Sequence, residues 1–463
     1  MSNQLTRREL MALTSAAVGA MAQSSNSDEV SVRVTTEGKR HALDPPLRWQ
    51  AAQGSPADAI VLDPSREFQE ILGFGAAFTD ASCYVLGQMG PEAREQLLRE
   101  LVHPSAMGLS VFRICVGSSD YATEAYSFDE GEPDADLRRF SIDHDRAYII
   151  PVLKQARTAN PDLFLLASPW SPPGWMKAGG SMLGGSMRKN YFAPYAKYLV
   201  RFLQDYRDAG VRVDAISVQN EVDTDQDGRM PACLWGQEYE MEFIARHLGP
   251  QLAANHVDTK VWILDHNYNL WGRAMDELDD RNVARYVDGV AWHGYAGEPA
   301  AMTRVHDAHP DKHAYWTEGG PDISDPAYAT DWAKWGAEFA AILRNWARCI
   351  IGWNLALDES GKPNIGPFPC GGLVTIHSKT KEVTRSGQYW ALAHYSRAVR
   401  RGALRIQSSG DLEGVSHVAF RNPDGSHAVL LTNTAEPRKL RLRLGGRETA
   451  ASLAGHSVTT LTW

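Results

Sequence analysis

The sequence lacks the features that mark several large classes of protein. Its five cysteines, Cys83, Cys115, Cys233, Cys349 and Cys370, are scattered and form no C-x-x-C pair. This spacing predicts neither a zinc site nor a disulfide framework, and it leaves a single disulfide open. A surplus of positive charge is also missing, because 56 acidic side chains face 47 basic ones and the net charge is −9. Such a chain offers no basic surface to nucleic acid or to an anionic membrane.

The chain also lacks an apolar run long enough to span a bilayer, so we expect no transmembrane segment. The mildly apolar stretch Leu10–Ala22 follows the pair Arg7-Arg8 and ends in Ala20-Met21-Ala22, an A-x-A cleavage site. This order predicts that residues 1–22 are a twin-arginine signal peptide cleaved near Gln23, with export to the periplasm or the extracellular space. The alternative is a disordered tail on a cytoplasmic protein.

Short apolar segments alternate with longer helical stretches over residues 68–394, which is typical of βα units. The strand candidates number eight, and this count predicts an α/β fold of the closed (β/α)₈ barrel type. They are Glu70–Phe74, Leu109–Ile114, Leu163–Ala167, Val213–Gln219, Lys260–Leu264, Gly289–His293, Ala314–Thr317 and Ile350–Leu355.

The two ends of the chain have a different pattern. Residues 28–67 and 395–463 contain extended segments with period-two alternation, separated by turn signals such as Pro-Asp-Gly. Neither end fits the barrel, so we expect both to contribute antiparallel strands to one β-sandwich domain.

Two of the predicted barrel strands end in a carboxylate. Val213–Gln219 leads into Asn220 and Glu221, and Ala314–Thr317 leads into Glu318. In a barrel of parallel strands this end carries the chemistry, and two carboxylates there suit hydrolysis of a glycosidic bond. The alternative for either residue alone is a helix cap or an ion pair with an arginine.

Roles for the two carboxylates follow from their neighbours. Asn220 suits a hydrogen bond to a sugar 2-hydroxyl, which favours Glu221 as acid/base and Glu318 as nucleophile. Arg113 and Tyr295 are predicted to keep Glu318 ionised by charge and hydrogen bonding. An ordinary ion pair for Arg113 and ordinary packing for Tyr295 remain alternatives.

The other predicted strand ends have the composition of a carbohydrate pocket. They offer aromatic rings for stacking and polar groups for hydroxyls. Candidate substrate-binding residues are Asp120, Trp170, Asn220, His293, Tyr295, Trp353 and Asn354.

Signals for a cofactor or a metal are weak, and we expect neither. Gly73-Phe-Gly75 opens like a dinucleotide fingerprint, but Phe78 stands where the third glycine belongs. Asp223-Thr-Asp225-Gln-Asp227-Gly228 copies the first half of an EF-hand loop, yet Leu234 replaces the bidentate glutamate at its twelfth position. Calcium there stays open beside the plainer interpretation of an acidic loop at the pocket rim.

Taken together, the motifs resemble glycoside hydrolase family 30, the family of lysosomal glucosylceramidase. The resemblance runs in order from about residue 68 to the carboxyl terminus. It rests on Gly73-Phe-Gly-Ala-Ala-Phe-Thr-Asp-Ala81, Arg113 with Gly117-Ser-Ser-Asp120, Ala167-Ser-Pro-Trp-Ser-Pro-Pro-Gly-Trp-Met-Lys177, Gln219-Asn-Glu221, Trp316-Thr-Glu318 and Gly352-Trp-Asn-Leu-Ala-Leu357.

The resemblance implies a barrel joined to a sandwich built from both termini, and a retaining double displacement without a cofactor. By motif position, Glu221 matches the acid/base and Glu318 the nucleophile. Positions that bind the terminal sugar (the glycone) are matched by Asp120, Trp170, Asn220, Trp353 and Asn354.

Three departures bear on the substrate. Val222 replaces the proline that commonly follows the acid/base, and His293-Gly294-Tyr295 replaces the glucosylceramidase sequence His-Trp-Tyr. The loop Asn364–Gly372 also differs. We therefore expect a β-linked glycoside, oligosaccharide or glycolipid of the glucosylceramidase or β-glucosidase type. Endo-1,6-β-glucanase and β-xylosidase activities are the alternatives within the family, and an inactive carbohydrate-binding protein is the alternative outside enzymes.

Overall fold

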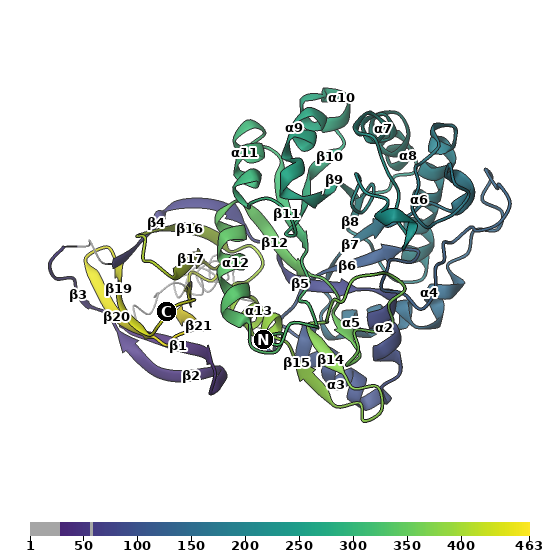
Figure 1. Cartoon of the computed structure of the whole chain (residues 1–463). Helices are drawn as coiled ribbons and strands as arrows, with labels where there is room; N and C mark the ends of the chain where they lie inside the picture. Colours follow the sequence, from purple (N-terminus) through teal and green to yellow (C-terminus); the bar gives the residue numbers. More distant parts are fainter. Residues whose placement is uncertain (1–27, 56–58) are drawn as a thin grey trace, which may run out of the picture.

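The computed structural model describes residues 28–55 and 59–463, so the predicted signal peptide, residues 1–22, lies outside the described residues. Two domains lie side by side (Figure 1). One is a closed barrel of eight strands and the other is built on a ten-stranded sheet. In the described part of the chain, no helix has the length and apolarity needed to cross a bilayer.

The barrel confirms the predicted (β/α)₈ architecture. All neighbouring strands run parallel, and β12 closes the ring by pairing with β5. The strands are β5 (Gly73–Phe78), β6 (Val111–Val116), β7 (Phe164–Pro169), β8 (Ala215–Ser217), β9 (Lys260–Asn267), β10 (Val287–His293), β11 (His313–Glu318) and β12 (Ala347–Gly352).

Two predicted strands were misplaced. Glu70 belongs to the second domain, where it ends β4, and the first barrel strand begins only at Gly73. Gly73 has a φ of 147°, which side-chain-bearing residues rarely adopt, so the chain changes direction there. The eighth strand ends at Gly352, because Asn354 turns the chain with a φ of 57°.

Helices surround the barrel with their apolar faces inward. In α6, for example, Tyr195, Leu199, Phe202 and Tyr206 are buried and recur at helical spacing. The helices are α2 (Asp80–Gly87), α3 (Pro91–Val102), α4 (Asp143–Ala147), α5 (Ile149–Ala159), α6 (Phe192–Asp208), α7 (Gln237–Phe243), α8 (Gly249–Ala254), α9 (Trp271–Asp279), α10 (Arg281–Ala284), α11 (Ala300–Ala308), α12 (Trp332–Arg344) and α13 (Gly387–Ala398). The shorter η elements are η1 (Gly174–Met176), η2 (Lys189–Tyr191), η3 (Gln226–Gly228), η4 (Ile244–Leu248) and η5 (Tyr268–Leu270).

The second domain combines strands from both ends of the chain, so purple and yellow strands lie in the same sheet in Figure 1. Strands from the amino-terminal part are β1 (Glu29–Thr36), β2 (Lys39–Arg48), β3 (Gln50–Ala51) and β4 (Ala59–Glu70). Those from the carboxyl-terminal part are β16 (Leu404–Ser409), β17 (Val415–Arg421), β18 (His427–Asn433), β19 (Arg438–Leu444), β20 (Arg447–Leu453) and β21 (Ser457–Thr462).

Strands from the two ends of the chain are neighbours in this sheet. β1 lies between β2 and β21, and β4 lies between β16 and β19. Alternate residues of these strands, such as Val30, Leu431 and Leu461, share one apolar core. Helices α12 and α13 pack between this domain and the barrel (Figure 1). A small sheet of β13 (Ala356–Leu357), β14 (Val374–Ile376) and β15 (Val383–Arg385) follows the last barrel strand.

Candidate active site

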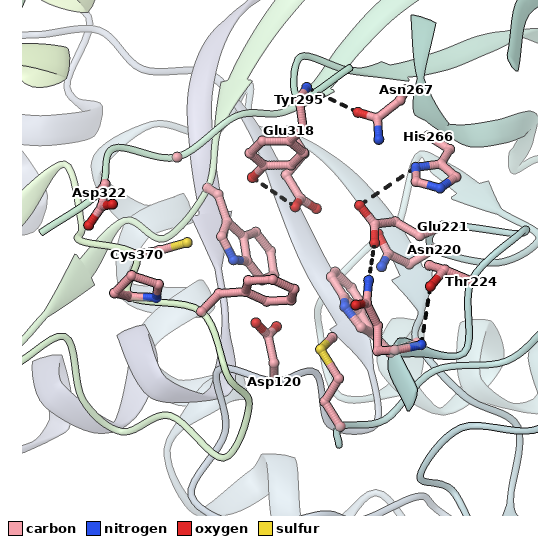
Figure 2. Close-up of a pocket in the computed structure, with 17 residues that line it drawn as sticks. Asp120, Asn220, Glu221, Thr224, His266, Asn267, Tyr295, Glu318, Asp322 and Cys370 are labelled. Atoms are coloured by element: carbon pink, nitrogen blue, oxygen red, sulfur yellow. Dashed lines mark hydrogen bonds and ion pairs between the residues drawn. The ribbon is translucent and has the colours of Figure 1, made fainter. Parts of the chain in front are cut away.

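A cavity of about 540 Å³ opens where the barrel strands end (Figure 2). Its size suits a small ligand. It brings together seven of the residues singled out from the sequence: Asp120, Trp170, Asn220, Glu221, Tyr295, Glu318 and Trp353. The remaining lining comes from Thr224, Gln226, Met230, His266, Asn267, Gly320, Asp322, Phe368, Pro369 and Cys370.

A β-bulge in β9 shapes the floor of this cavity. Along β10, Ala291 pairs with Leu264 but Trp292 pairs with His266, so β9 contains one extra residue. Leu264 and Asp265 both have positive φ, 69° and 46°. Without the extra residue, Leu264 would follow Trp262 into the barrel interior. The bulge instead points Leu264 outward and places Asp265 inside.

Asp265 is the centre of a buried polar network. Its carboxylate accepts hydrogen bonds from Ser168 (2.8 Å), Ser217 (2.6 Å) and Thr317 (2.8 Å). It also forms an ion pair with Arg113 at 2.7 Å. Burial alone would raise the pKa of Asp265, but the Arg113 charge and the hydrogen bond from His293 hold that pKa far below its usual range. Asp265 is therefore a fixed negative charge.

Arg113 connects Asp265 to residues that line the cavity. Its guanidinium donates to Asn220 Oδ1 at 2.7 Å and to the Glu318 carboxylate. It lies over the Trp170 ring, 4.6 Å from the centroid. Burial would lower the pKa of Arg113, but the charges of Asp265 and Glu318 raise it, so the group stays cationic. Arg113 thus orients one carboxylate, one amide and one aromatic ring of the cavity.

Glu318 receives donors on both of its oxygens. Arg113 contacts Oε2, and the Tyr295 hydroxyl donates to Oε1 at 3.1 Å. The Tyr295 ring itself is 48% exposed and forms part of the rim. Gly294 precedes it because a side chain there would meet the Trp316 indole at 2.8 Å. Position 294 therefore has little room for a side chain.

Glu221 sits on strained backbone and is partly open to the cavity. Its φ is 52°, and its N–H donates to the Asp265 carbonyl oxygen at 3.0 Å. Gln226 donates to Oε2 at 3.0 Å, while His293 and His266 face Oε1 at 3.3 and 3.6 Å. Burial raises the pKa of Glu221, but the His293 hydrogen bond and the His266 charge outweigh burial and lower it.

His293 connects the two carboxylates from below. Its Nδ1 faces Glu221 at 3.3 Å, and its Nε2 lies 3.1 Å from Asp265 and 3.8 Å from Glu318. Burial would lower the pKa of His293, but the Glu318 charge and the hydrogen bonds to Asp265 and Glu221 raise it to about 9. His293 is therefore a cation at neutral pH, with both ring nitrogens protonated.

The same geometry bears on metal binding. Among residues 28–55 and 59–463, the one group of three ligand-type side chains close enough for an ion is Glu221, His266 and His293. Both ring nitrogens of His293 already face carboxylates, Nδ1 facing Glu221 at 3.3 Å and Nε2 facing Asp265 at 3.1 Å. His266 Nε2 faces Asp223 at 2.6 Å. The cluster is accounted for by ion pairs.

The acidic loop after Glu221 does not gather its carboxylates. Asp223 faces His266, Asp225 accepts from the Asp227 amide at 3.2 Å, and Asp227 points outward beside Arg229. Three different partners leave no common point for calcium, so the interpretation as a rim loop is favoured.

One end of the cavity is closed. Trp170 and Trp353 stack with centroids 5.1 Å apart, and Asp120 lies buried nearby. Burial and the charges of Glu318 and Glu221 raise the pKa of Asp120 well above its usual range. The Asp120 carbonyl oxygen accepts from Ile365, and a Cβ on Gly366 would come within 2.5 Å of the Asp120 Cβ. The loop at 364–370 therefore packs directly behind Asp120.

Two predicted substrate-binding residues, His293 and Asn354, do not line the cavity. His293 and Asn354 have no exposed surface. His293 supports the carboxylates from beneath, and the Asn354 side-chain oxygen accepts from Thr79 at 2.9 Å. Asn354 has a left-handed backbone with a φ of 57° and is absent from the cavity lining.

Several lining residues had no individual prediction. His266 follows the fifth predicted strand, as does the buried Asp265 beneath the cavity, so their place at a strand end was a usable signal. Met230, Phe368 and Cys370 lie on loops and Gln226 begins the short element η3, so no periodic pattern predicts these contacts. All five cysteines are free.

Comparisons with known proteins cover both domains. Residues 71–399 match the model of the glycosyl hydrolase family 30 TIM-barrel domain, and residues 402–461 match that of the glycosyl hydrolase family 30 beta sandwich domain. An endo-1,6-beta-D-glucanase of Neurospora crassa is 32% identical over 418 residues, which are 85% of this chain and 86% of that protein. The lysosomal acid glucosylceramidase of Mus musculus is 29% identical over 433 residues, 87% of this chain and 83% of that protein.

Solved structures agree. SrfJ from Salmonella typhimurium superposes with a TM-score of 0.90 at 26% identity, over 94% of this chain and 99% of that chain. The endo-beta1,6-glucanase BT3312 superposes with a TM-score of 0.84 at 29% identity, again over 94% and 99%.

Proposed function

Because this chain belongs to glycoside hydrolase family 30 and is an O-glycosyl hydrolase, we propose that it cleaves β-glucosidic bonds by a retaining double displacement. The observation that carries the proposal is the pair Glu221 and Glu318. Both line one cavity, and the cation His293 faces both from beneath.

In the first step Glu318 attacks the anomeric carbon while Glu221 protonates the departing glycosidic oxygen. Glu318 suits attack because Arg113 and Tyr295 donate to its two oxygens and fix the direction of the carboxyl group. Asn220, held by Arg113, is placed to bind the sugar 2-hydroxyl, a contact that strengthens in the transition state.

In the second step water releases the sugar from Glu318, and Glu221 takes the proton of that water. Glu221 suits both tasks because it is the more open of the two carboxylates. Asp120 and the stacked pair of Trp170 and Trp353 would hold the glycone at the closed end.

The test of the assignment is a pair of substitutions. Glu318→Ala should abolish turnover of 4-nitrophenyl β-D-glucoside while the protein still melts cooperatively. Glu221→Ala should form a glycosyl-enzyme with an activated aryl glucoside, detectable by intact mass, and release it slowly. Turnover surviving in Glu318→Ala, or an inverted anomer in the wild-type product, would refute the mechanism.

The sugar and the mode of action need a separate assay. Side-by-side 4-nitrophenyl β-D-glucoside, xyloside, galactoside and fucoside should show glucoside as the fastest. Endo-1,6-β-glucanase action is the second candidate, favoured by the Neurospora crassa relative and by BT3312. A β-1,6-glucan releasing mixed lengths would support it, whereas single glucose units, or cleavage of glucosylceramide, would support the glucosidase type. Export by the Tat pathway remains a proposal that rests on Arg7, Arg8 and Ala20-Met21-Ala22 alone.

A further inference from the structure

At the bulge in β9, one main-chain N–H donates to a group outside the barrel sheet. An extra residue in a strand disrupts the local pairing, and a buried N–H without a partner is costly. The Leu264 N–H finds its partner outside the sheet, in the Glu240 carboxylate at 3.3 Å. Glu240 is fully buried on α7, one of the helices that flank β9 (Figure 1).

Glu240 is itself held by a second helix. Arg273 of α9 donates to Glu240 at 2.5 Å and to Glu277 at 2.9 Å. Burial and the charge of Glu240 raise the pKa of Glu277 well above its usual range. Glu240 and Glu277 are both fully buried and share the guanidinium of Arg273, which supplies the counter-charge that buried carboxyl groups need.

Two contacts lead from this cluster to the catalytic carboxylate Glu221. The first runs through the bulge, because the Asp265 carbonyl oxygen accepts the Glu221 N–H at 3.0 Å. In the second, Arg273 donates to the Trp235 carbonyl oxygen at 2.9 Å, and the Trp235 N–H donates to the Val222 carbonyl oxygen at 2.8 Å. None of Glu240, Arg273 and Trp235 lines the cavity.

We propose that Glu240 is a positioning residue for the reaction, acting through Leu264 and Asp265. By accepting the Leu264 N–H it fixes the bulge that sets the Asp265 carboxylate under Arg113 and His293. The same bulge sets the carbonyl oxygen that holds the strained peptide of Glu221. This inference rests on the proposed roles of Glu221 and Glu318.

The chain supplies a matched control for this role. Glu277 is as buried as Glu240 and shares Arg273 with it, but Glu240 alone reaches Leu264. A purely structural cluster would respond alike to loss of either carboxyl group. A positioning role would make catalysis respond to Glu240 only.

The experiment compares Glu240→Met with Glu277→Met on the 4-nitrophenyl glycoside that the wild type hydrolyses fastest. Both variants should melt at lower temperature, and both should fold because each leaves Arg273 one carboxylate. Glu240→Met should lose about 100-fold in kcat, the scale of a small misplacement of catalytic groups, with KM little changed. Glu277→Met should keep kcat within a few-fold of the wild type, on the order of the scatter between neutral substitutions.

Two further variants keep the test decisive if Glu240→Met does not fold. Glu240→Gln retains an oxygen for the Leu264 N–H and should keep most of kcat. Glu240→Asp keeps the charge beside Arg273 but shortens the reach to Leu264, and should lose kcat while staying folded. Equal kcat losses at positions 240 and 277, or wild-type kcat in Glu240→Asp, would overturn the proposal. A wild type that prefers another sugar would refute the proposed substrate and leave this comparison intact.

Discussion

The barrel interior has two layers of opposite character. The lower layer is apolar and consists of Val111, Leu166, Ala215, Trp262, Ala291, Tyr315, Cys349 and Ile351. The layer above it, nearer the cavity, is polar and consists of Arg113, Ser168, Ser217, Asp265, His293 and Thr317. On most strands the polar residue follows the apolar one by two positions, so one alternating pattern supplies both layers.

The layers differ in what holds them together. In the lower layer Trp262 stacks on Tyr315 with centroids 3.7 Å apart, and packing suffices for stability. The upper layer buries charged groups, which lose their hydration. Their mutual attraction compensates for that loss only when the geometry is good. Its cation Arg113 and anion Asp265 have no exposed side-chain surface. Both layers contribute to stability, but only the upper one contacts the catalytic carboxylates, so substitutions can separate catalysis from stability.

The largest effect is expected for Asp265→Asn in the polar layer. The change keeps the shape but leaves Arg113 and His293 without their shared counter-charge. We expect kcat to fall by about 10²–10³-fold, the scale of losing one preorganised electrostatic group. The free energy of unfolding should fall by ~3–5 kcal/mol, as for a broken buried ion pair. Steady-state kinetics and urea denaturation check both, and an unchanged kcat would contradict a catalytic role for this layer.

The matching change in the apolar layer is Trp262→Ala. It removes the ring that stacks on Tyr315 and should lower the free energy of unfolding by ~3–5 kcal/mol. Because Trp262 touches neither Glu221 nor Glu318, kcat should stay at the wild-type value at temperatures where the variant is folded. A loss of kcat as large as that of Asp265→Asn would show that the layers are not separable.

The same contrast explains how far the sequence alone predicts this protein. The alternation of strands and helices predicts the barrel, and strand ends mark Glu221 and Glu318, because period-two patterns and parallel topology leave few choices. The bulge at Leu264 and Asp265 breaks that period, so reading Lys260–Leu264 as a regular strand misses the polar centre. Asn354, predicted to bind substrate from its place after a strand, has a left-handed backbone, is buried and does not line the cavity. Irregular backbone is decided by tertiary contacts such as that of Glu240.

The smallest effect is expected in the pH dependence of His266→Gln. The charge of His266 helps to lower the pKa of Glu221. Without it that pKa rises, and Glu221 keeps the proton that the leaving group needs up to a higher pH. The basic limb of kcat/KM, which reports the free enzyme, should therefore move to higher pH with 4-nitrophenyl β-D-glucoside. A 2,4-dinitrophenyl leaving group departs without a proton, so its kcat/KM profile should not move. A shift of both profiles, or of neither, would mean that His266 does not tune the acid/base Glu221. The polar layer would then end at His293.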